Sequence, residues 1–277
     1  MMILGIDIGG TNITIGQVKD GKVVKSVAVK SFDREWDLDR TLEYLSAQID
    51  TLFSPEVEGI GFGVPTVVDV ENGIVYDAAN IPSWKKVELK SFFEKKYGCP
   101  VRVNNDSNCY ALGAYASMPE ASRQGSMVAM TLGTGVGMGI VIGGKLFCGA
   151  NCGAGELSCL PYLDATIEDY TSKKFFHNRG TDPKTAHMDA LAGKPEALAL
   201  YKEYGEHMGY AVSSILFAYD PKTIVLGGGV SNNFPLFRDS MCEYLKKNFP
   251  YPKTVENIDI VVMTDELIPV LGAASLI

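Results

Sequence analysis

Apolar residues near the start of the chain form two short runs on either side of a Gly-rich turn. Residues 3–8 predict a strand, Gly9-Gly10-Thr11 a tight turn, and residues 13–18 a second strand. Residues 127–147 repeat this order, with a second Gly/Thr turn at Gly133-Thr134-Gly135. Repetition at this scale indicates a duplicated architecture.

The rest of the chain alternates between buried strands and amphipathic helices. Leucine and isoleucine recur at helical spacing from Leu38 to Leu52, which predicts a helix with one core-facing stripe. Further helices are expected at 89–97, 111–116, 166–176, 196–219, 234–249 and 269–277, and further strands at 58–64, 67–70, 74–76, 101–103, 223–226 and 258–263. The pattern predicts an α/β protein with a duplicated β-sheet.

Length and charge restrict the possible functions. The chain has 277 residues, enough for two domains, and 46% of them are hydrophobic. A formal net charge of −8 argues against a nucleic-acid partner, which would favour a basic surface. There is no apolar run of membrane-spanning length and no signal-peptide pattern, so we expect a cytoplasmic protein without a membrane partner, its six cysteines reduced.

The two Gly/Thr turns are candidate phosphate sites. Phosphate oxygens can be bound by backbone N–H groups of the first turn, at Gly9, Gly10, Thr11 and Asn12, and by those of the second turn. Asp7 lies inside the first apolar run. Because a buried charge without a partner is costly, its carboxylate needs a cation, a hydrogen-bond donor or water. The alternative is an ordinary hairpin with a surface aspartate. Two such turns could clamp a nucleotide in a cleft between two similar domains.

A polar run, Asn104-Asn105-Asp106-Ser107-Asn108, joins a predicted strand to a helix. Ligands commonly bind at the carboxyl ends of strands in α/β folds, which makes Asp106 a candidate catalytic group. The local alternative is a helix N-cap, since caps favour Asn, Asp and Ser. Five small polar residues in a row exceed what a cap requires.

Three further features follow the second turn. Glu156 ends a flexible loop, and Glu168 lies near the start of a helix, where an acidic residue could simply favour the helix dipole. Gly227, Gly228 and Gly229 separate a strand from a helix, so that a flat ring could approach the backbone; a plain tight turn is the alternative.

Together these motifs resemble the ROK sugar kinases, which have the two-domain actin-like ATPase fold, related to ribonuclease H. The resemblance covers essentially the whole chain. It rests on six motifs in the family's order: 7–12 and 131–137 as phosphate motifs, 105–108 as the N-D-x-N catalytic motif, 227–231 as the adenosine motif, Asn80 with Trp84 as the sugar loop, and 272–274 as the C-terminal G-A-A.

The resemblance implies ATP-dependent phosphorylation of a hexose. Asp106 would be the general base, Mg²⁺ would bind with ATP near Asp7, and glucose is the expected substrate. Hydroxyl groups of the sugar would be bound by Asn80, Asn105, Asp106, Glu156 and Glu168, with Thr66 beside the sugar. A homodimer is expected, with domains at 1–106 and 107–266 and the C-terminal helix, about 267–277, packed on the first.

The chain departs from the family pattern at three places. Cys159 stands where the family has a histidine that contacts the sugar and ligates zinc, and the family's zinc loop is missing before Glu168. Thr66 replaces a common glycine. Although Cys148, Cys152 and Cys159 lie close in sequence, structural zinc usually needs four ligands, so we expect no zinc.

Other functions remain open at this point. The family contains sugar-responsive regulators, but these carry a helix-turn-helix before the first phosphate motif, which here begins at Met2. Kinases for another hexose, for fructose or for an N-acetylhexosamine are alternatives. A non-sugar ATPase of the actin class is disfavoured by the N-D-x-N run and Glu156.

Overall fold

The computed structural model describes residues 1–78, 80–123 and 125–277, and these divide into two compact units. Unit 1 contains the described residues of 1–123 together with 146–154 and 265–277. Unit 2 contains the described residues of 124–145 together with 155–264. The domain boundary near residue 106 stays a prediction.

Unit 1 is built on a mixed five-stranded sheet with the order β3-β2-β1-β4-β8. The first three strands form an antiparallel meander, and β4 and β8 run parallel to β1. The bounds are Met2–Ile8 for β1, Asn12–Lys19 for β2, Lys22–Lys30 for β3, Val57–Val64 for β4 and Val101–Asn105 for β8.

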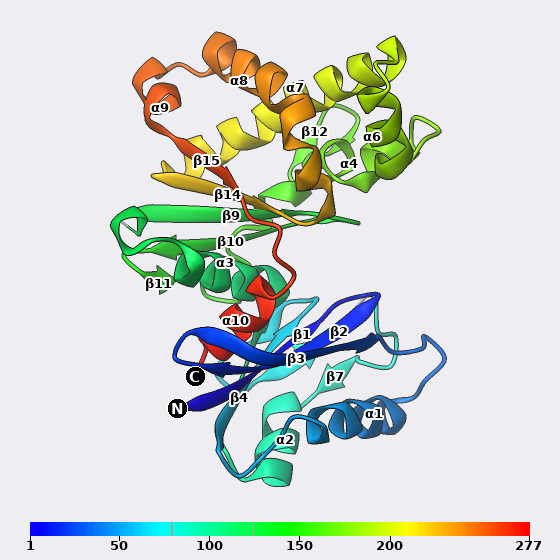
Figure 1. The fold of residues 1–277 in the computed structure, drawn as a ribbon, viewed down its shortest axis with the longest axis vertical. Helices are drawn as coiled ribbons and strands as arrows, with labels where there is room; N and C mark the ends of the chain where they lie inside the picture. Colours follow the sequence, from blue (N-terminus) through cyan, green and yellow to red (C-terminus); the bar gives the residue numbers. More distant parts are fainter. Residues whose placement is uncertain (79, 124) are drawn as a thin grey trace. The chain divides into compact units, whose positions relative to one another are not determined.

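Alternation along β1 assigns its side chains to two faces. Leu4 and Ile6 are fully buried in the cluster that contains the apolar stripe of α1 (Leu38–Asp50). Ile3, from the other face, packs against Val270 of α10 (Ile268–Ala274). Figure 1 shows α1 and α2 (Leu89–Tyr97) on one side of this sheet and α10 on the other. Both faces of the sheet are therefore covered by helices.

Helix α10 lies unusually close to its neighbours because glycines face it. A Cβ at Gly61 of β4 would lie 1.8 Å from the carbonyl oxygen of Ala273. On the other side, a Cβ at Gly272 would lie 1.6 Å from the carbonyl oxygen of Cys109, in α3 (Asp106–Ser117). The C-terminal helix thus connects the sheet to α3 through contacts that only glycine permits.

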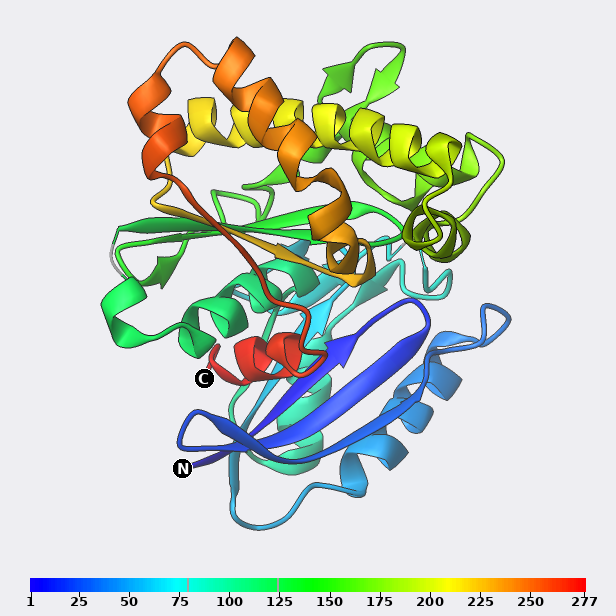
Figure 2. The same cartoon turned by 45° about the horizontal axis from the view of Figure 1, so that its top comes forward.

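Unit 2 repeats the sheet, with the order β11-β10-β9-β14-β15. Figure 2 shows α7 (Pro195–Tyr219) and α8 (Phe234–Asn248) side by side over one face of this sheet. The strands are β9 (Ser126–Leu132), β10 (Val136–Ile142), β11 (Lys145–Leu146), β14 (Thr223–Gly227) and β15 (Asp259–Val262). Both units therefore have a hairpin at one side of the sheet and parallel pairing at the other.

Shorter elements complete the fold. A three-stranded sheet contains β5 (Val68–Asp69), β6 (Ile74–Tyr76) and β7 (Lys86–Val87), and a small hairpin contains β12 (Pro161–Tyr162) and β13 (Ala165–Thr166). The 3₁₀ helices are η1 (Glu120–Ser122), η2 (Glu156–Cys159) and η3 (Gly229–Asn233), and α9 spans Pro252–Asn257. Along the described chain, helices are too short or too polar to cross a membrane.

One helix prediction is corrected by the structure, and two short helices were not predicted. The expected helix over 166–176 is two helices, α4 (Ile167–Thr171) and α5 (Lys173–His177). Ser172 has extended backbone angles and its hydroxyl caps the second helix by accepting from Lys174 N–H, so the hydrophobic spacing continues across a break. Neither α6 (Pro183–Leu191) nor α9 was predicted, because the buried residues of α6 are only Ala186 and Ala190 and α9 has none.

We predict that Gly272→Ala destabilises the protein by about 1–3 kcal/mol, since the added methyl group would overlap backbone atoms that cannot rotate away. In a sterically free helix the same change would stabilise slightly. Gly153→Ala, with nothing within 4 Å of the added Cβ, is the matched control in the same unit. Equal denaturant midpoints for the two variants would contradict the packing argument.

Candidate active site

The carboxyl ends of the parallel strands in unit 1 bring Asp7 and Asp106 together. Asp7 of β1 is paired with Gly63 of β4, which in turn is paired with Asn104 of β8. Asp106 follows directly as the first residue of α3, and a Cβ placed on Gly63 would lie 3.5 Å from the Asp106 Cα. Two carboxylates therefore lie at one edge of the sheet, where α/β folds bind ligands.

This edge is electrostatically unfavourable for Asp7. Burial, and secondarily the negative charge of Asp106, raise the pKa of Asp7 to about 7. A cation or a hydrogen-bond donor at this position would lower that pKa again. Asp7 is thus the kind of carboxylate that a bound divalent cation would stabilise.

Asn105, and not Asp106, caps helix α3. The Asn105 Oδ1 accepts hydrogen bonds from the backbone N–H groups of Ser107 and Asn108, at 2.9 and 3.3 Å. Asp106 lies inside the first turn, where its Oδ1 accepts from Ser107 N–H at 2.7 Å. The N-cap alternative for Asp106 is therefore wrong, because its neighbour performs that role.

Thr66 lies next to the same edge. The Asn105 Nδ2 donates to the Thr66 carbonyl oxygen at 3.2 Å. The Thr66 hydroxyl donates to the carbonyl oxygen of Tyr76 at 2.9 Å. Its side chain thus fixes the path of the β5–β6 hairpin, while its backbone orients the Asn105 amide.

The first Gly/Thr turn is close to Asn80. The turn is closed by a hydrogen bond from Gly9 N–H to the Asn12 carbonyl oxygen at 2.9 Å. A Cβ on Gly10 would lie 3.3 Å from the Asn80 Nδ2. Trp84 is buried, and its indole N–H donates to Thr41 Oγ1 at 2.8 Å. Trp84 therefore anchors the loop in the core while Asn80 is exposed.

In unit 2, Glu168 is bound to the second Gly/Thr turn. Its Oε2 accepts from Val136 N–H at 2.9 Å, directly after the turn, and its Oε1 accepts from Lys174 Nζ at 2.7 Å. The Gly133 carbonyl oxygen accepts from Lys173 N–H at 2.9 Å. The Glu168 carboxylate is therefore positioned by two groups of its own unit, a role that helix-dipole reasoning did not reveal.

Glu156 and Cys159 lie at either end of η2. The Cys159 thiol donates to Glu156 Oε2 at 3.6 Å, and both residues are exposed. Partial burial, together with the charge of Glu156, raises the pKa of Cys159. The thiol is therefore neutral near pH 7 and is a weak hydrogen-bonding group where the family has an imidazole.

A cavity of about 540 Å³ in unit 2 joins the second turn to the triple glycine. Thr134 and Gly229 both line it, whereas Gly227 ends β14 and Gly228 precedes η3. Its other lining residues include Lys173, Lys184, His177 and His187. Sequence reasoning missed these four cationic or titratable groups, because they come from α5 and α6, far along the chain from either motif.

Within the described ranges, no three or more His, Cys, Asp or Glu side chains are grouped so that they could hold a metal ion. Asp7 could contribute to a cation site only together with groups of another kind, such as phosphate oxygens or water. The residues suit a cation that arrives with its ligand.

Comparison with known proteins identifies the family. The ROK family model matches residues 3–277. A glucokinase from Thermotoga maritima is 26% identical over 100% of this chain and 97% of its own. An N-acetyl-D-glucosamine kinase from Vibrio cholerae is 30% identical over 89% of this chain and 90% of its own.

A solved structure agrees with these relatives. The ROK family glucokinase from Streptomyces griseus, in complex with glucose and AMPPNP, superposes with a TM-score of 0.80 at 25% identity, covering 100% of this chain and 99% of that one. The predicted α/β, actin-like ATPase fold is confirmed by this likeness. From its motifs, its fold and these relatives, the chain belongs to the ROK family.

Proposed function

We propose that this protein transfers the γ-phosphoryl group of ATP to a hydroxyl group of a hexose, with glucose as its substrate. Family membership and the kinase names of the relatives support sugar phosphorylation by ATP. The observation that carries the proposal is the grouping of Asp106 with Asp7, Asn105 and the Thr66 backbone at one sheet edge. The homodimer and the cytoplasmic location are part of the same proposal.

Asp106 is the proposed general base. An alcohol is too weak an acid to attack a phosphoryl group unaided near pH 7, and a carboxylate within hydrogen-bond reach can accept its proton as the P–O bond forms. Asn105 caps α3 and so fixes the backbone from which Asp106 projects. Phosphoryl transfer depends mainly on such positioning and on charge stabilisation.

Unit 2 supplies the proposed nucleotide site. The cavity between Thr134 and Gly229 has room for an adenosine, and Lys173 and Lys184 bring positive charge to its wall. Backbone N–H groups of both Gly/Thr turns, at 10–12 and 134–135, are proposed to bind phosphate oxygens, while the Gly9 and Gly133 N–H groups close the two turns. Mg²⁺ bound with ATP would neutralise phosphate charge, and Asp7 is the carboxylate proposed to interact with it.

The sugar is proposed to be bound through carboxylates and amides. Asn80 and Asn105 from unit 1, and Glu156 and Glu168 from unit 2, are assigned to its hydroxyl groups. Because Glu168 already accepts bonds from Val136 and Lys174, it is held in one orientation and would lose little entropy on binding a ligand. Preorganised acceptors of this kind suit a polyhydroxylated substrate.

An N-acetylhexosamine is the second candidate substrate. The relative at 30% identity is an N-acetyl-D-glucosamine kinase, and Cys159 offers only a weak hydrogen bond to a sugar hydroxyl. Loss of a strong bond there would relax selection between a hydroxyl and an acetamido group.

A coupled assay of ADP release, run over hexoses and N-acetylhexosamines, tests this proposal. We expect the highest kcat/KM with glucose. A maximum with N-acetylglucosamine would favour the second candidate. Sugar binding by calorimetry without ADP release for any sugar would contradict the kinase proposal and favour a sugar-responsive regulator.

We predict that Asp106→Asn lowers kcat by about 10²–10⁴-fold while sugar affinity persists, because the amide keeps the shape but cannot accept the proton. Asp39→Asn, an exposed carboxylate in the first turn of α1, is the matched control and should leave kcat unchanged. A large loss of sugar affinity at unchanged kcat would instead make Asp106 a binding residue.

We predict that Asp7→Asn stabilises the ligand-free protein at about pH 8, by on the order of 2 kcal/mol, and abolishes activity. Because the folded-state pKa is raised to about 7, folding favours protonated Asp7, and stability is lost as the pH rises from about 4 through that value. The stability gain of the variant should therefore shrink toward about pH 4. Denaturant titrations without Mg²⁺ or nucleotide measure it; a gain independent of pH would refute the assignment.

A further inference from the structure

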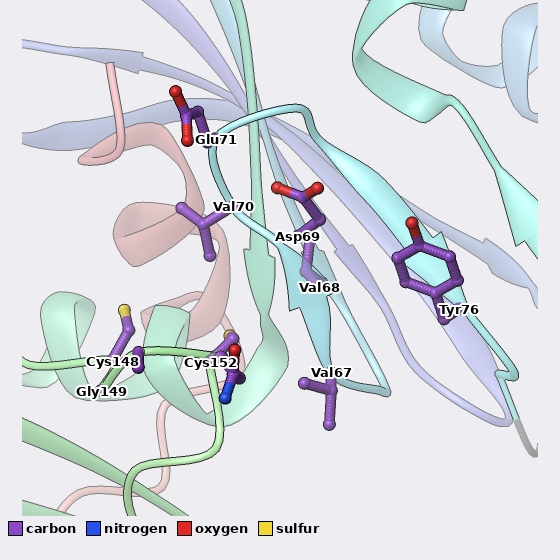
Figure 3. Close-up of a pocket in the computed structure, with 11 residues that line it drawn as sticks. Val67, Val68, Asp69, Val70, Glu71, Tyr76, Cys148, Gly149 and Cys152 are labelled. Atoms are coloured by element: carbon purple, nitrogen blue, oxygen red, sulfur yellow. The ribbon is translucent and has the colours of Figure 1, made fainter.

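Two cysteines of one loop, Cys148 and Cys152, lie next to the first turn of helix α3. The loop that follows β11 carries Cys148 and Cys152 (Figure 3), and both sulfurs contact the side chains of Asn104 and Asn108. The Cys152 thiol lies 3.4 Å and the Cys148 thiol 3.9 Å from the same Asn104 Oδ1. The Asn108 Nδ2 also donates to both sulfurs, at 3.7 Å for Cys148 and 3.6 Å for Cys152. The pair is thus already assembled before any reaction.

The backbone of the loop holds this arrangement in place. The Cys148 carbonyl oxygen accepts from Ala154 N–H at 3.0 Å, which closes the loop. Cys152 has a φ of 58°, in the left-handed region that residues other than glycine rarely adopt. Such a conformation costs free energy and persists where its surroundings enforce it. The loop therefore holds the Cys152 sulfur against Asn104 and Asn108, which the Cys148 sulfur also contacts, at some cost in stability.

A small molecule can reach both sulfurs. Cys148 and Cys152 line a cavity of about 800 Å³, together with Val67, Val70 and Tyr76 of the neighbouring hairpin (Figure 3). Cys152 is otherwise only 5% exposed.

The surroundings make one of the two sulfurs acidic. The hydrogen bond from Cys148 lowers the pKa of Cys152 to about 6, and backbone N–H groups of Val68 and Asn105 and the Asn108 amide add to the effect. The same hydrogen bond, followed by burial, raises the pKa of Cys148. A thiolate next to a protonated thiol is the pairing that disulfide chemistry needs.

We propose that Cys148 and Cys152 form a reversible disulfide site, oxidised by a small peroxide. The Cys152 thiolate attacks one oxygen of hydrogen peroxide, breaking the O–O bond and giving Cys152 sulfenic acid and hydroxide. The Cys148 sulfur then displaces the sulfenic hydroxyl, which leaves as water with the Cys148 proton, and the S–S bond forms. Two thiols are oxidised, one peroxide is reduced, and a dithiol reductant reverses the change.

The disulfide would disturb the residues on both sides of Asp106. Asn104 Oδ1 accepts from Asn105 N–H at 2.8 Å and from Asn108 Nδ2 at 2.9 Å, and both thiols point to it. Oxidation removes the Cys148 S–H donor and the Cys152 thiolate charge, and it draws the two sulfurs together into one bond. The second step of the proposal is an effect of the disulfide on activity, and it rests on the proposed function. With Asp106 as the base, oxidation should lower kinase activity.

The test is mass spectrometry of the full chain after brief exposure to a slight excess of hydrogen peroxide, quenched with a thiol-blocking reagent. We expect a peptide that links Cys148 to Cys152, lighter by two hydrogens, and its return to two free thiols with dithiothreitol. Cys242→Ser, at a half-buried thiol in unit 2, is the control and should still form the link. Free thiols at 148 and 152 while another cysteine is oxidised would overturn the proposal.

Kinase activity on the same samples tests the second step. We expect a several-fold, dithiothreitol-reversible loss of kcat in the natural protein and no loss in Cys148→Ser, a nearly isosteric change. A complete disulfide with unchanged kcat would overturn the link to α3. An inactive reduced protein would contradict the proposed function instead, and the mass measurement would still decide whether the disulfide forms.

Discussion

The burial of the Asp7 carboxylate, next to the negative charge of Asp106, is the constraint on which the proposed site depends. A buried carboxylate beside a second negative charge destabilises the folded chain, and the raised pKa of Asp7 reflects that cost. The apolar strands on either side of Asp7 must therefore provide enough burial to hold it there. The buried charge of Asp7 lowers the stability of the ligand-free protein, and a bound cation would offset that cost. The same carboxylate that destabilises unit 1 therefore favours the proposed binding of a cation and a polar ligand.

Close packing around α10 keeps Asp106 at that edge. Gly5 and Gly61 let α10 approach the sheet, and Gly113 and Gly272 let α3 approach α10, with each hypothetical Cβ within 2.0 Å of a backbone oxygen. Backbone-to-backbone contacts of this kind leave little freedom to slide. The start of α3 is therefore fixed from two directions, by the Asn105 cap and by the C-terminal helix, although the sequence places these elements far apart.

Local sequence patterns predicted most of the strands and helices, and they indicated the residues of unit 1 that are proposed for the site. The alternation in β1, the stripe in α1 and the polar run before α3 each depend on a few neighbouring residues, so the sequence revealed them. What it did not reveal depends on contacts between distant segments. Lys184 reaches the Thr134 cavity from α6, and Cys152 reaches Asn104 across the chain. The break at Ser172 was missed because a hydroxyl cap interrupts a helix without interrupting its hydrophobic spacing.

The central claim is that the Asp106 carboxylate accepts the proton of the attacking sugar hydroxyl. A crystal structure with glucose and a non-hydrolysable ATP analogue tests it most directly. The account predicts one sugar hydroxyl within about 2.6–3.2 Å of an Asp106 carboxylate oxygen and facing the γ-phosphate. A sugar whose phosphate-facing hydroxyl contacts Glu156 or Glu168, with Asp106 turned away, would contradict it.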